Sequence, residues 1–432
     1  MAASEAGKGK VGILVGGGPA PGINGVIGSA TIEAINCGLE VVGIYDGFKW
    51  LAQADEAALR EHVRPLGVDD VNEARFRGGS ILHTSRVNPT EDDAKMANVA
   101  AGLAALGVDR LITIGGDDTA YSASQTSKHT QGRVRVAHVP KTIDNDLPLP
   151  NNMPTFGFRT ARDIGGRLVG NLMEDARTTQ RWYVVVAMGR SAGHLALGMG
   201  SLGGASITII PEEFPPDTLT LAGLCDIIEG TIVKRAAMGR HYGVAVVAEG
   251  VGLLMQEELD KHPLCAGLVR DEHNHVRLSE VPLSLILKRM LEQRCEQRGK
   301  KATVVHKTIG YELRCADPIS VDFEYVQQLG WGAVRYLLRL GEGRYAESGA
   351  MISIQAGEIV PIPFSDLIDP ETGRTMVRRV NMDSDQYLCA RSFMLRLERE
   401  DFADEAHVAA LAAASGLSVE QFREKFAHVA GL

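Results

Sequence analysis

The chain has 432 residues, of which 45% are apolar and 23% charged, a composition typical of globular proteins. Its formal net charge of −9 argues against a general binder of nucleic acid or of membrane surfaces. A few basic residues in a cleft would still suffice for a phosphorylated substrate. The length allows two α/β domains, or one domain with large insertions.

Strand-like runs alternate with helical stretches along most of the chain. Near-continuous β-branched runs, which suit strands buried on both faces of a parallel sheet, occupy 11–15, 40–45, 110–116, 134–140, 182–189, 206–212, 243–250 and 302–309. Helix candidates include 23–38 and 283–299, and the pattern from about 383 to 432 is helical with no strand signal. This alternation predicts doubly wound α/β sheets with ligand sites at the carboxyl ends of their strands.

Three features bear on the compartment. The six cysteines have no metal-ligand spacing, which predicts free thiols in a reducing environment. The first ten residues, MAASEAGKGK, lack the apolar core of a signal peptide. No apolar run approaches the ~20 residues that cross a membrane. We therefore expect a cytoplasmic protein without a membrane partner.

The first loop of interest is VGGGPAPGINGVI (15–27), between a strand and a helix. Its glycines let the backbone approach a ligand closely, and the amides that begin the following helix favour an anion. The loop matches neither a Walker A loop nor the dinucleotide fingerprint, and a plain strand-to-helix turn is the alternative. We expect Gly17 to contact a diphosphate.

The second loop, IGGDDT (114–119), places Asp117 and Asp118 on one turn. One aspartate there could cap a helix. A second one on the same turn indicates a metal ion or a cationic partner. Magnesium takes few carboxylates and keeps water and phosphate oxygens as its other ligands, so Asp117 is a candidate Mg²⁺ ligand.

The third element is VPKTIDNDLP (139–148), in which Asp144 and Asp146 are two residues apart after a strand and can converge on one cleft. Phosphoryl transfer needs a carboxylate that takes the acceptor hydroxyl's proton, and a metal and cations that stabilise the moving phosphoryl group. Asp144 as base, Asp117 on magnesium and Lys141 as cation form such a set. A solvated acidic turn is the alternative.

Six motifs follow one another in the chain: GGGPAPGIN, GGDDT, PKTIDND, MGR (188–190), AEG (248–250) and GYELR (310–314). In this set and order the chain resembles the phosphofructokinase family from Val11 to about Asp322. The resemblance implies two Rossmann-like doubly wound α/β domains with a helical C-terminal tail. The implied domains are a phosphoryl-donor domain at 8–156 plus about 311–360, a sugar-phosphate domain at about 157–310, and a helical extension at about 383–432.

The family's motifs also imply roles for residues of this chain. By this resemblance Asp144 is the proton acceptor, Arg190 holds the reacting phosphoryl group, and Glu249 bonds sugar hydroxyls. Arg181 matches a family arginine that reaches the neighbouring subunit's sugar-phosphate site, so we expect a homodimer or homotetramer. The full set of residues expected to bind the sugar phosphate is Thr142, Ile143, Asp144, Met188, Gly189, Arg190, Glu249, Tyr311, Glu312, Leu313, Arg314 and Arg181, with Tyr311 and Arg314 as the clamp for the 6-phosphate.

The family divides by phosphoryl donor, and Asp118 and Lys141 resemble the members that use pyrophosphate. Relatives of the bacterial ATP-using members carry Gly in place of Asp118. Asp118 would stand where the α-phosphate of ATP must lie, and two like charges at ~4 Å cost roughly 4 kcal/mol at an effective dielectric of 20. Lys141 offsets the extra carboxylate. Arg86 is a donor-side cation or an ordinary surface arginine. The glycine loop lacks the Asp of the common GGDAPG form.

The expected reaction is reversible, Mg²⁺-dependent transfer of a phosphoryl group from pyrophosphate to the 1-hydroxyl of D-fructose 6-phosphate, a glycolytic step. An ATP-dependent phosphofructokinase is the first alternative. A non-catalytic regulatory subunit is the second, although it would be expected to lose the base or the metal carboxylate. A lipid or NAD kinase shares a GGDG-like loop but has no counterpart of TIDND, MGR or GYELR.

Overall fold

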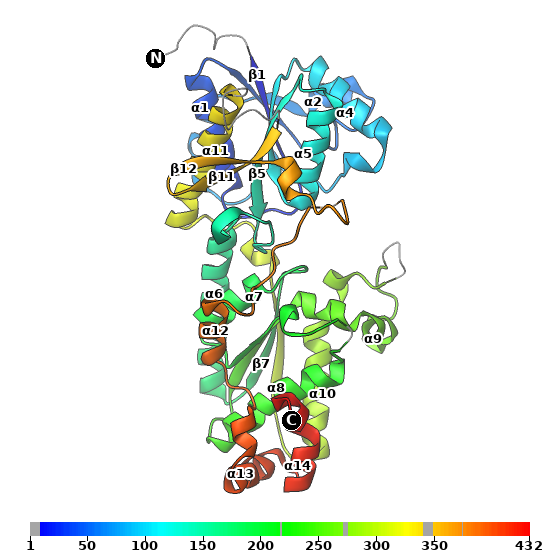
Figure 1. The fold of residues 1–432 in the computed structure, drawn as a ribbon, viewed down its shortest axis with the longest axis vertical. Helices are drawn as coiled ribbons and strands as arrows, with labels where there is room; N and C mark the ends of the chain where they lie inside the picture. Colours follow the sequence, from blue (N-terminus) through cyan, green and yellow to red (C-terminus); the bar gives the residue numbers. More distant parts are fainter. Residues whose placement is uncertain (1–8, 217, 271–274, 340–348, 374) are drawn as a thin grey trace. The chain divides into compact units, whose positions relative to one another are not determined.

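The computed structural model describes residues 9–216, 218–270, 275–339, 349–373 and 375–432. The chain forms two compact units, which are Met1–Ala161 with Glu312–Arg378 and Arg162–Tyr311 with Arg379–Leu432. Figure 1 shows both, each built on a sheet covered by helices. The observed architecture is the expected one of α/β sheets followed by a helical C-terminal segment.

The sheet of the first unit is parallel in its centre and antiparallel at both edges. Its order is β12-β11-β5-β4-β1-β2-β3, with β6 paired to β5. The edge strands β3 and β12 run antiparallel to β2 and β11. The strands are β1 (Lys10–Val15), β2 (Glu40–Ile44), β3 (Val63–Pro65), β4 (Arg110–Gly115), β5 (Arg135–Thr142), β6 (Phe156–Gly157), β11 (Gly349–Gln355) and β12 (Glu358–Pro363). The four strands predicted here, β1, β2, β4 and β5, are confirmed.

Helices cover both faces of this sheet (Figure 1). On one face Ile13 and Val15 of β1 share a core with residues of α1 and α11, and Leu14 points into the opposite core with residues of α4 and α5. This strict alternation is why β1 reads as a continuous apolar run. The helices are α1 (Ile23–Asn36), α2 (Glu56–Glu61), α3 (Val68–Asn72), α4 (Asp93–Ala105), α5 (Asp117–His129) and α11 (Ser320–Leu338).

The second unit contains a four-stranded sheet in the order β10-β7-β9-β8, in which every neighbouring pair is parallel. All four strands were predicted, and β7 and β9 are buried along their whole length. The strands are β7 (Trp182–Ala187), β8 (Ile207–Ile209), β9 (Gly243–Ala248) and β10 (Val304–Ile309). The helices are α6 (Phe158–Thr179), which begins in the first unit, α7 (His194–Leu202), α8 (Leu221–Ala237), α9 (Gln256–Lys261) and α10 (Leu283–Gln297).

The C-terminal segment belongs to the second unit and is helical, as predicted. It contains α12 (Asp385–Ser392), α13 (Glu405–Ser415) and α14 (Val419–Phe426). Phe402, Phe422 and Phe426 form a satellite core with Val233 of α8. The ammonium of Lys425 lies 3.1 Å from the buried carboxylate of Glu229, also on α8. Within the described part of the chain, no helix has the length and apolarity to cross a membrane.

Candidate active site

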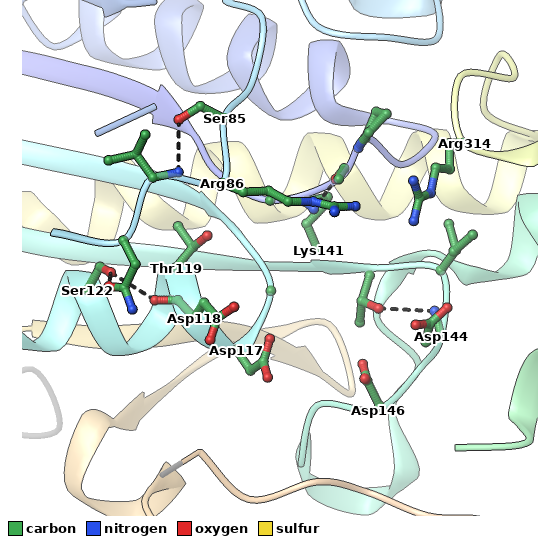
Figure 2. Close-up of a pocket in the computed structure, with 18 of the residues that line it drawn as sticks. Ser85, Arg86, Asp117, Asp118, Thr119, Ser122, Lys141, Asp144, Asp146 and Arg314 are labelled. Atoms are coloured by element: carbon green, nitrogen blue, oxygen red, sulfur yellow. Dashed lines mark hydrogen bonds between the residues drawn. The ribbon is translucent and has the colours of Figure 1, made fainter. Parts of the chain in front are cut away.

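Three of the sequence motifs meet at one edge of the first unit's sheet. β5, β4 and β1 are adjacent and parallel, so the loops after them emerge side by side. The chain places β2 on one side of β1 and β4 on the other, and α/β enzymes bind ligands at such a reversal of strand order. A cavity of about 220 Å³ lies there, lined by Gly17, Gly18, Pro19, Phe48, Ser85, Arg86, Val87, Asn88, Gly116, Asp117, Asp118, Thr119, Ser122, Lys141, Thr142, Ile143, Asp144, Asp146 and Arg314 (Figure 2).

The glycine loop after β1 forms one wall of this pocket. Gly17 has a φ of 77°, in the left-handed region that favours glycine, and its amide donates to the carbonyl of Ser85 at 2.8 Å. The hydroxyl of Thr84 donates to the carbonyl of Gly17 at 2.5 Å. A side chain at Gly17 would begin 3.4 Å from the ammonium of Lys141. The bare backbone therefore leaves space for a ligand beside that ammonium.

Asp117 and Asp118 are the first two residues of α5, and both are exposed. The residue before the helix is Gly116, and no side chain caps this end. The expectation that an aspartate here could serve as the N-cap is therefore wrong. The turn begins one residue earlier, so both carboxyl groups lie in the first helical turn and line the pocket. The helix dipole stabilises negative charge at this position.

Lys141, near the end of β5, is buried at 4% exposure. Its ammonium donates to the carbonyl of Gly18. Burial, and then the nearby Arg314 guanidinium, lower the pKa of Lys141 to about 8, against the opposing attraction of Asp144, Asp117 and Asp146. The lysine therefore carries its charge near neutral pH and is close to losing it just above.

The turn after β5 brings Asp144 and Asp146 to the same pocket, as predicted. The amide of Asp144 donates to the hydroxyl of Thr142 at 3.0 Å. Between the two aspartates, Asn145 adopts a left-handed conformation with a φ of 59°. Burial, and then the charge of Asp117, raise the pKa of Asp146. Two carboxylates from different loops thus share one partly desolvated space.

The charges that line the pocket favour a divalent cation. Four carboxyl groups, from Asp117, Asp118, Asp144 and Asp146, face three cationic side chains, from Arg86, Lys141 and Arg314. Among the described residues no group of three His, Cys, Asp or Glu side chains could hold a metal by itself. Magnesium at a phosphoryl-transfer site needs fewer protein ligands, because one or two carboxylates act with phosphate oxygens and water. The pocket fits such an ion.

Two arginines approach the pocket from segments distant in sequence (Figure 2). Arg86 is exposed and follows the strand-like bridge between Gly16 and Ser85. Arg314 belongs to the segment that returns to the first unit, and its guanidinium would lie 3.4 Å from a side chain at Gly18. The structure therefore places Arg314 with the glycine loop and Lys141.

Another group of motif residues meets at the carboxyl edge of the second unit's sheet. Met188 follows β7, and its amide donates to the carbonyl of Ile309 at 2.9 Å. The amide of Gly189 donates to the carboxylate of Glu249 at 3.4 Å, and the amide of Gly250 donates to the carbonyl of Gly189 at 3.0 Å. The MGR, AEG and GY stretches therefore lie together because β7, β9 and β10 are parallel neighbours.

The sequence matches the phosphofructokinase family model over residues 10–337. The chain belongs to the phosphofructokinase family. It is 51% identical to the pyrophosphate–fructose 6-phosphate 1-phosphotransferase of Thermotoga maritima, over 98% of this chain and 99% of that one. It is 45% identical to the enzyme of the same name from Naegleria fowleri, over 97% and 95%.

A solved structure of a pyrophosphate-dependent phosphofructokinase from Marinobacter aquaeolei has the same fold, with a TM-score of 0.64. It is 16% identical to this chain, and the match covers 95% of this chain and 92% of that one. At this identity the likeness concerns the fold alone.

Some of the residues expected from the phosphofructokinase motifs lie apart from the others. Arg181 precedes β7, at the edge of the sheet opposite Met188, and its guanidinium is 4.0 Å from the carboxylate of Asp175. Leu313 is fully buried, which leaves only its backbone for a ligand. Tyr311 is 65% exposed. The unit boundary falls between Tyr311 and Glu312, within the GYELR motif.

Three polar residues of the pocket were not predicted, namely Ser85, Asn88 and Ser122. The hydroxyl of Ser122 donates to the carbonyl of Asp118 at 2.9 Å, one helical turn earlier. The spacing of four residues after Asp118 was a signal for this position, because such residues share a helix face. Ser85 and Asn88 follow no periodic pattern that could have indicated them.

Proposed function

We propose that this protein transfers a phosphoryl group reversibly from pyrophosphate to the 1-hydroxyl of D-fructose 6-phosphate, giving D-fructose 1,6-bisphosphate and phosphate. The observation that carries the proposal is Asp118, which lines the same pocket as Lys141 and Asp144. Its carboxylate stands against the α-phosphate of a nucleotide but not against pyrophosphate. The names of the two relatives, which match along nearly their whole length, support the same donor and acceptor.

In this mechanism Asp144 takes the proton of the 1-hydroxyl as that oxygen attacks the phosphorus. The bond from phosphorus to the bridging oxygen of pyrophosphate breaks, and phosphate leaves. Lys141 and Arg190 stabilise the charge on the transferred group, which carries most of the catalysis in phosphoryl transfer. Gly17 and Arg86 bind the donor.

Asp117 would hold a magnesium ion, which neutralises phosphate charge when bound. The fit rests on the exposure of Asp117 and on the excess of carboxyl groups over cations in the pocket. Asp117 also interacts electrostatically with the raised-pKa Asp146, so a cation between the two loops would relieve their repulsion.

We assign the donor to the first unit and the sugar phosphate to residues of both units. In the second unit these are Met188, Gly189 and Arg190 after β7, Glu249 after β9 and Tyr311 after β10. In the first they are Thr142, Ile143, Glu312, Leu313 and Arg314. We further propose that Arg181 serves the site of a neighbouring subunit in a cytoplasmic homodimer or homotetramer.

A coupled assay with pyrophosphate or ATP as the donor tests this proposal directly. We expect product with pyrophosphate and Mg²⁺, and little with ATP at the same concentration. An ATP-dependent phosphofructokinase would reverse the preference. A non-catalytic subunit would give no turnover with either donor although it binds fructose 6-phosphate.

Arg314→Ala tests the assignment of the 6-phosphate clamp. Loss of a hydrogen bond to a charged group costs roughly 1.5–3 kcal/mol, so we expect the KM for fructose 6-phosphate to rise about tenfold or more. The KM for pyrophosphate should change little. Initial rates over a range of each substrate measure both constants. A rise confined to the pyrophosphate KM would instead place Arg314 on the donor, beside the glycine loop that it contacts.

The pKa of Lys141 predicts a limit on activity at high pH. The charged ammonium is the active form and exists below its pKa of about 8, so kcat/KM for pyrophosphate should fall as the pH rises through that value. Arg314→Ala removes a neighbouring cation and should move this fall to higher pH. The profile is measured at saturating fructose 6-phosphate. A profile that stays level well above pH 8 in both proteins would contradict the role of Lys141.

A further inference from the structure

The turn that carries Asp144 and Asp146 begins a loop with an irregular backbone. Asn145, Asn151 and Asn152 have φ angles of 59°, 53° and 53°, in the left-handed region that few residues other than glycine adopt. Asparagine tolerates this region better than most residues, but such conformations persist only where the surrounding structure holds them. The two carboxyl groups at the pocket therefore depend on whatever fixes this loop.

The side chain of Arg378 makes contacts at both ends of the loop. Its Nε donates to the carbonyl of Asn145 at 3.0 Å, and its Nη1 donates to the carbonyl of Met153 at 2.7 Å. Its Nη2 donates to the side-chain oxygen of Asn145, which also accepts from the amide of Thr155 at 3.1 Å. The backbone amide of Arg378 donates to the carbonyl of Asp146 at 2.7 Å.

This arrangement uses the particular shape of arginine. The guanidinium presents its donors in a fixed plane, so one side chain can fix the direction of several carbonyls at once. Arg378 is half-buried, and burial lowers its pKa while the charge of Asp146 raises it. Placing a cation in such a position is costly unless its donors are satisfied, and the loop carbonyls satisfy them.

Arg378 is absent from the residues that line the pocket, so its contacts act on the turn and leave the ligand space open. It also lies beyond residues 10–337, the part that matches the family model, so the family motifs assign it no role. Figure 1 shows the segment that follows β12 running back to the region below β5.

We propose that Arg378 is a positioning residue for phosphoryl transfer, because it fixes the turn Asp144–Asn145–Asp146 and thereby the direction of the proposed base. The inference rests on the proposed role of Asp144. A displacement of a reacting group by about 1 Å can cost 10²-fold in rate. Loss of the guanidinium should therefore act on kcat and leave substrate binding largely intact.

The experiment compares Arg378→Ala and Arg378→Lys with Arg379→Ala, the same change at the exposed neighbouring arginine. We expect Arg378→Ala to lower kcat by about 10²-fold with both KM values within threefold of wild type. Arg378→Lys keeps the charge but loses the planar fork, so its kcat should lie between the two. Arg379→Ala should match wild type.

A double-mutant cycle with Asn145→Gly separates positioning from general stability. Glycine adopts the left-handed conformation without strain but removes the side-chain oxygen that Arg378 contacts. If Arg378 acts through this turn, Arg378→Ala should lower kcat at least tenfold less in the Asn145→Gly background than in wild type. Unfolding temperatures of all variants are measured in parallel.

The outcomes decide between the readings. A folded Arg378→Ala with kcat within twofold of wild type overturns the proposal, and so do fully additive effects on kcat in the cycle. If Arg378→Ala does not fold, the test passes to Arg378→Lys, and a wild-type kcat there overturns it. Asp144→Asn is assayed beside these variants. Full turnover of Asp144→Asn would remove the base assignment itself, which is a separate result from any effect at Arg378.

Discussion

Asp144→Asn should abolish most turnover and leave the protein folded and able to bind its substrates. The change removes the group that accepts the proton of the 1-hydroxyl, and loss of a general base typically costs ~10²–10⁴-fold in rate. The amide of Asp144 still donates to Thr142 in the variant, so the backbone of the turn should be kept. The measurement is kcat with pyrophosphate and fructose 6-phosphate, both saturating.

Asp383→Asn, the same change at an exposed aspartate outside the pocket, is the matched control and should retain wild-type kcat. Binding of fructose 1,6-bisphosphate by the Asp144→Asn protein, followed by the shift in its unfolding temperature, shows whether the site is intact. Wild-type turnover in Asp144→Asn would refute the assignment of the base.

Asp118→Gly should increase the ratio of kcat/KM for ATP to that for pyrophosphate by at least ~10²-fold. The repulsion between Asp118 and an α-phosphate amounts to roughly 4 kcal/mol at ~4 Å and an effective dielectric of 20, or about a thousandfold. The expected change is smaller because Asp118 is exposed and water screens part of this repulsion. Use of pyrophosphate should fall in the same variant, because Lys141 then faces one carboxylate fewer. Initial rates with each donor, at saturating fructose 6-phosphate and Mg²⁺, give the ratio.

Asp118→Asn separates charge from bulk, because the amide has nearly the size of the carboxylate. If charge excludes ATP, Asp118→Asn should reproduce most of the change in Asp118→Gly. If bulk excludes it, only the glycine variant should respond, and addition of Lys141→Gly should extend the effect. Glycine in the first turn of α5 costs stability of about 1 kcal/mol at most, so both variants should fold. An unchanged ratio in folded Asp118→Gly would show that donor choice lies elsewhere.

The residues of the pocket could be found from sequence because each lies directly after a strand that can be recognised locally. Gly17, Asp117 and Asp144 follow buried β-branched runs, and parallel neighbouring strands bring such positions to one edge. The order of the motifs and the type of each side chain then indicate phosphoryl transfer. The hairpin of β11 and β12 was not predicted, although Ala356 and Gly357 have the positive φ values of a tight hairpin turn.

The sequence by itself determined the fold class, the strands that position the loops, and the chemistry of the side chains that follow them, since all of these depend on short-range patterns. Tertiary structure decided which cations share the pocket and what holds the catalytic turn. Arg314 reaches Gly18, and Arg378 reaches Asn145, across separations of hundreds of residues. The burial of Lys141, which lowers its pKa, likewise comes from packing around it. No local pattern encodes such contacts, because they depend on where distant segments return to the same edge of the sheet.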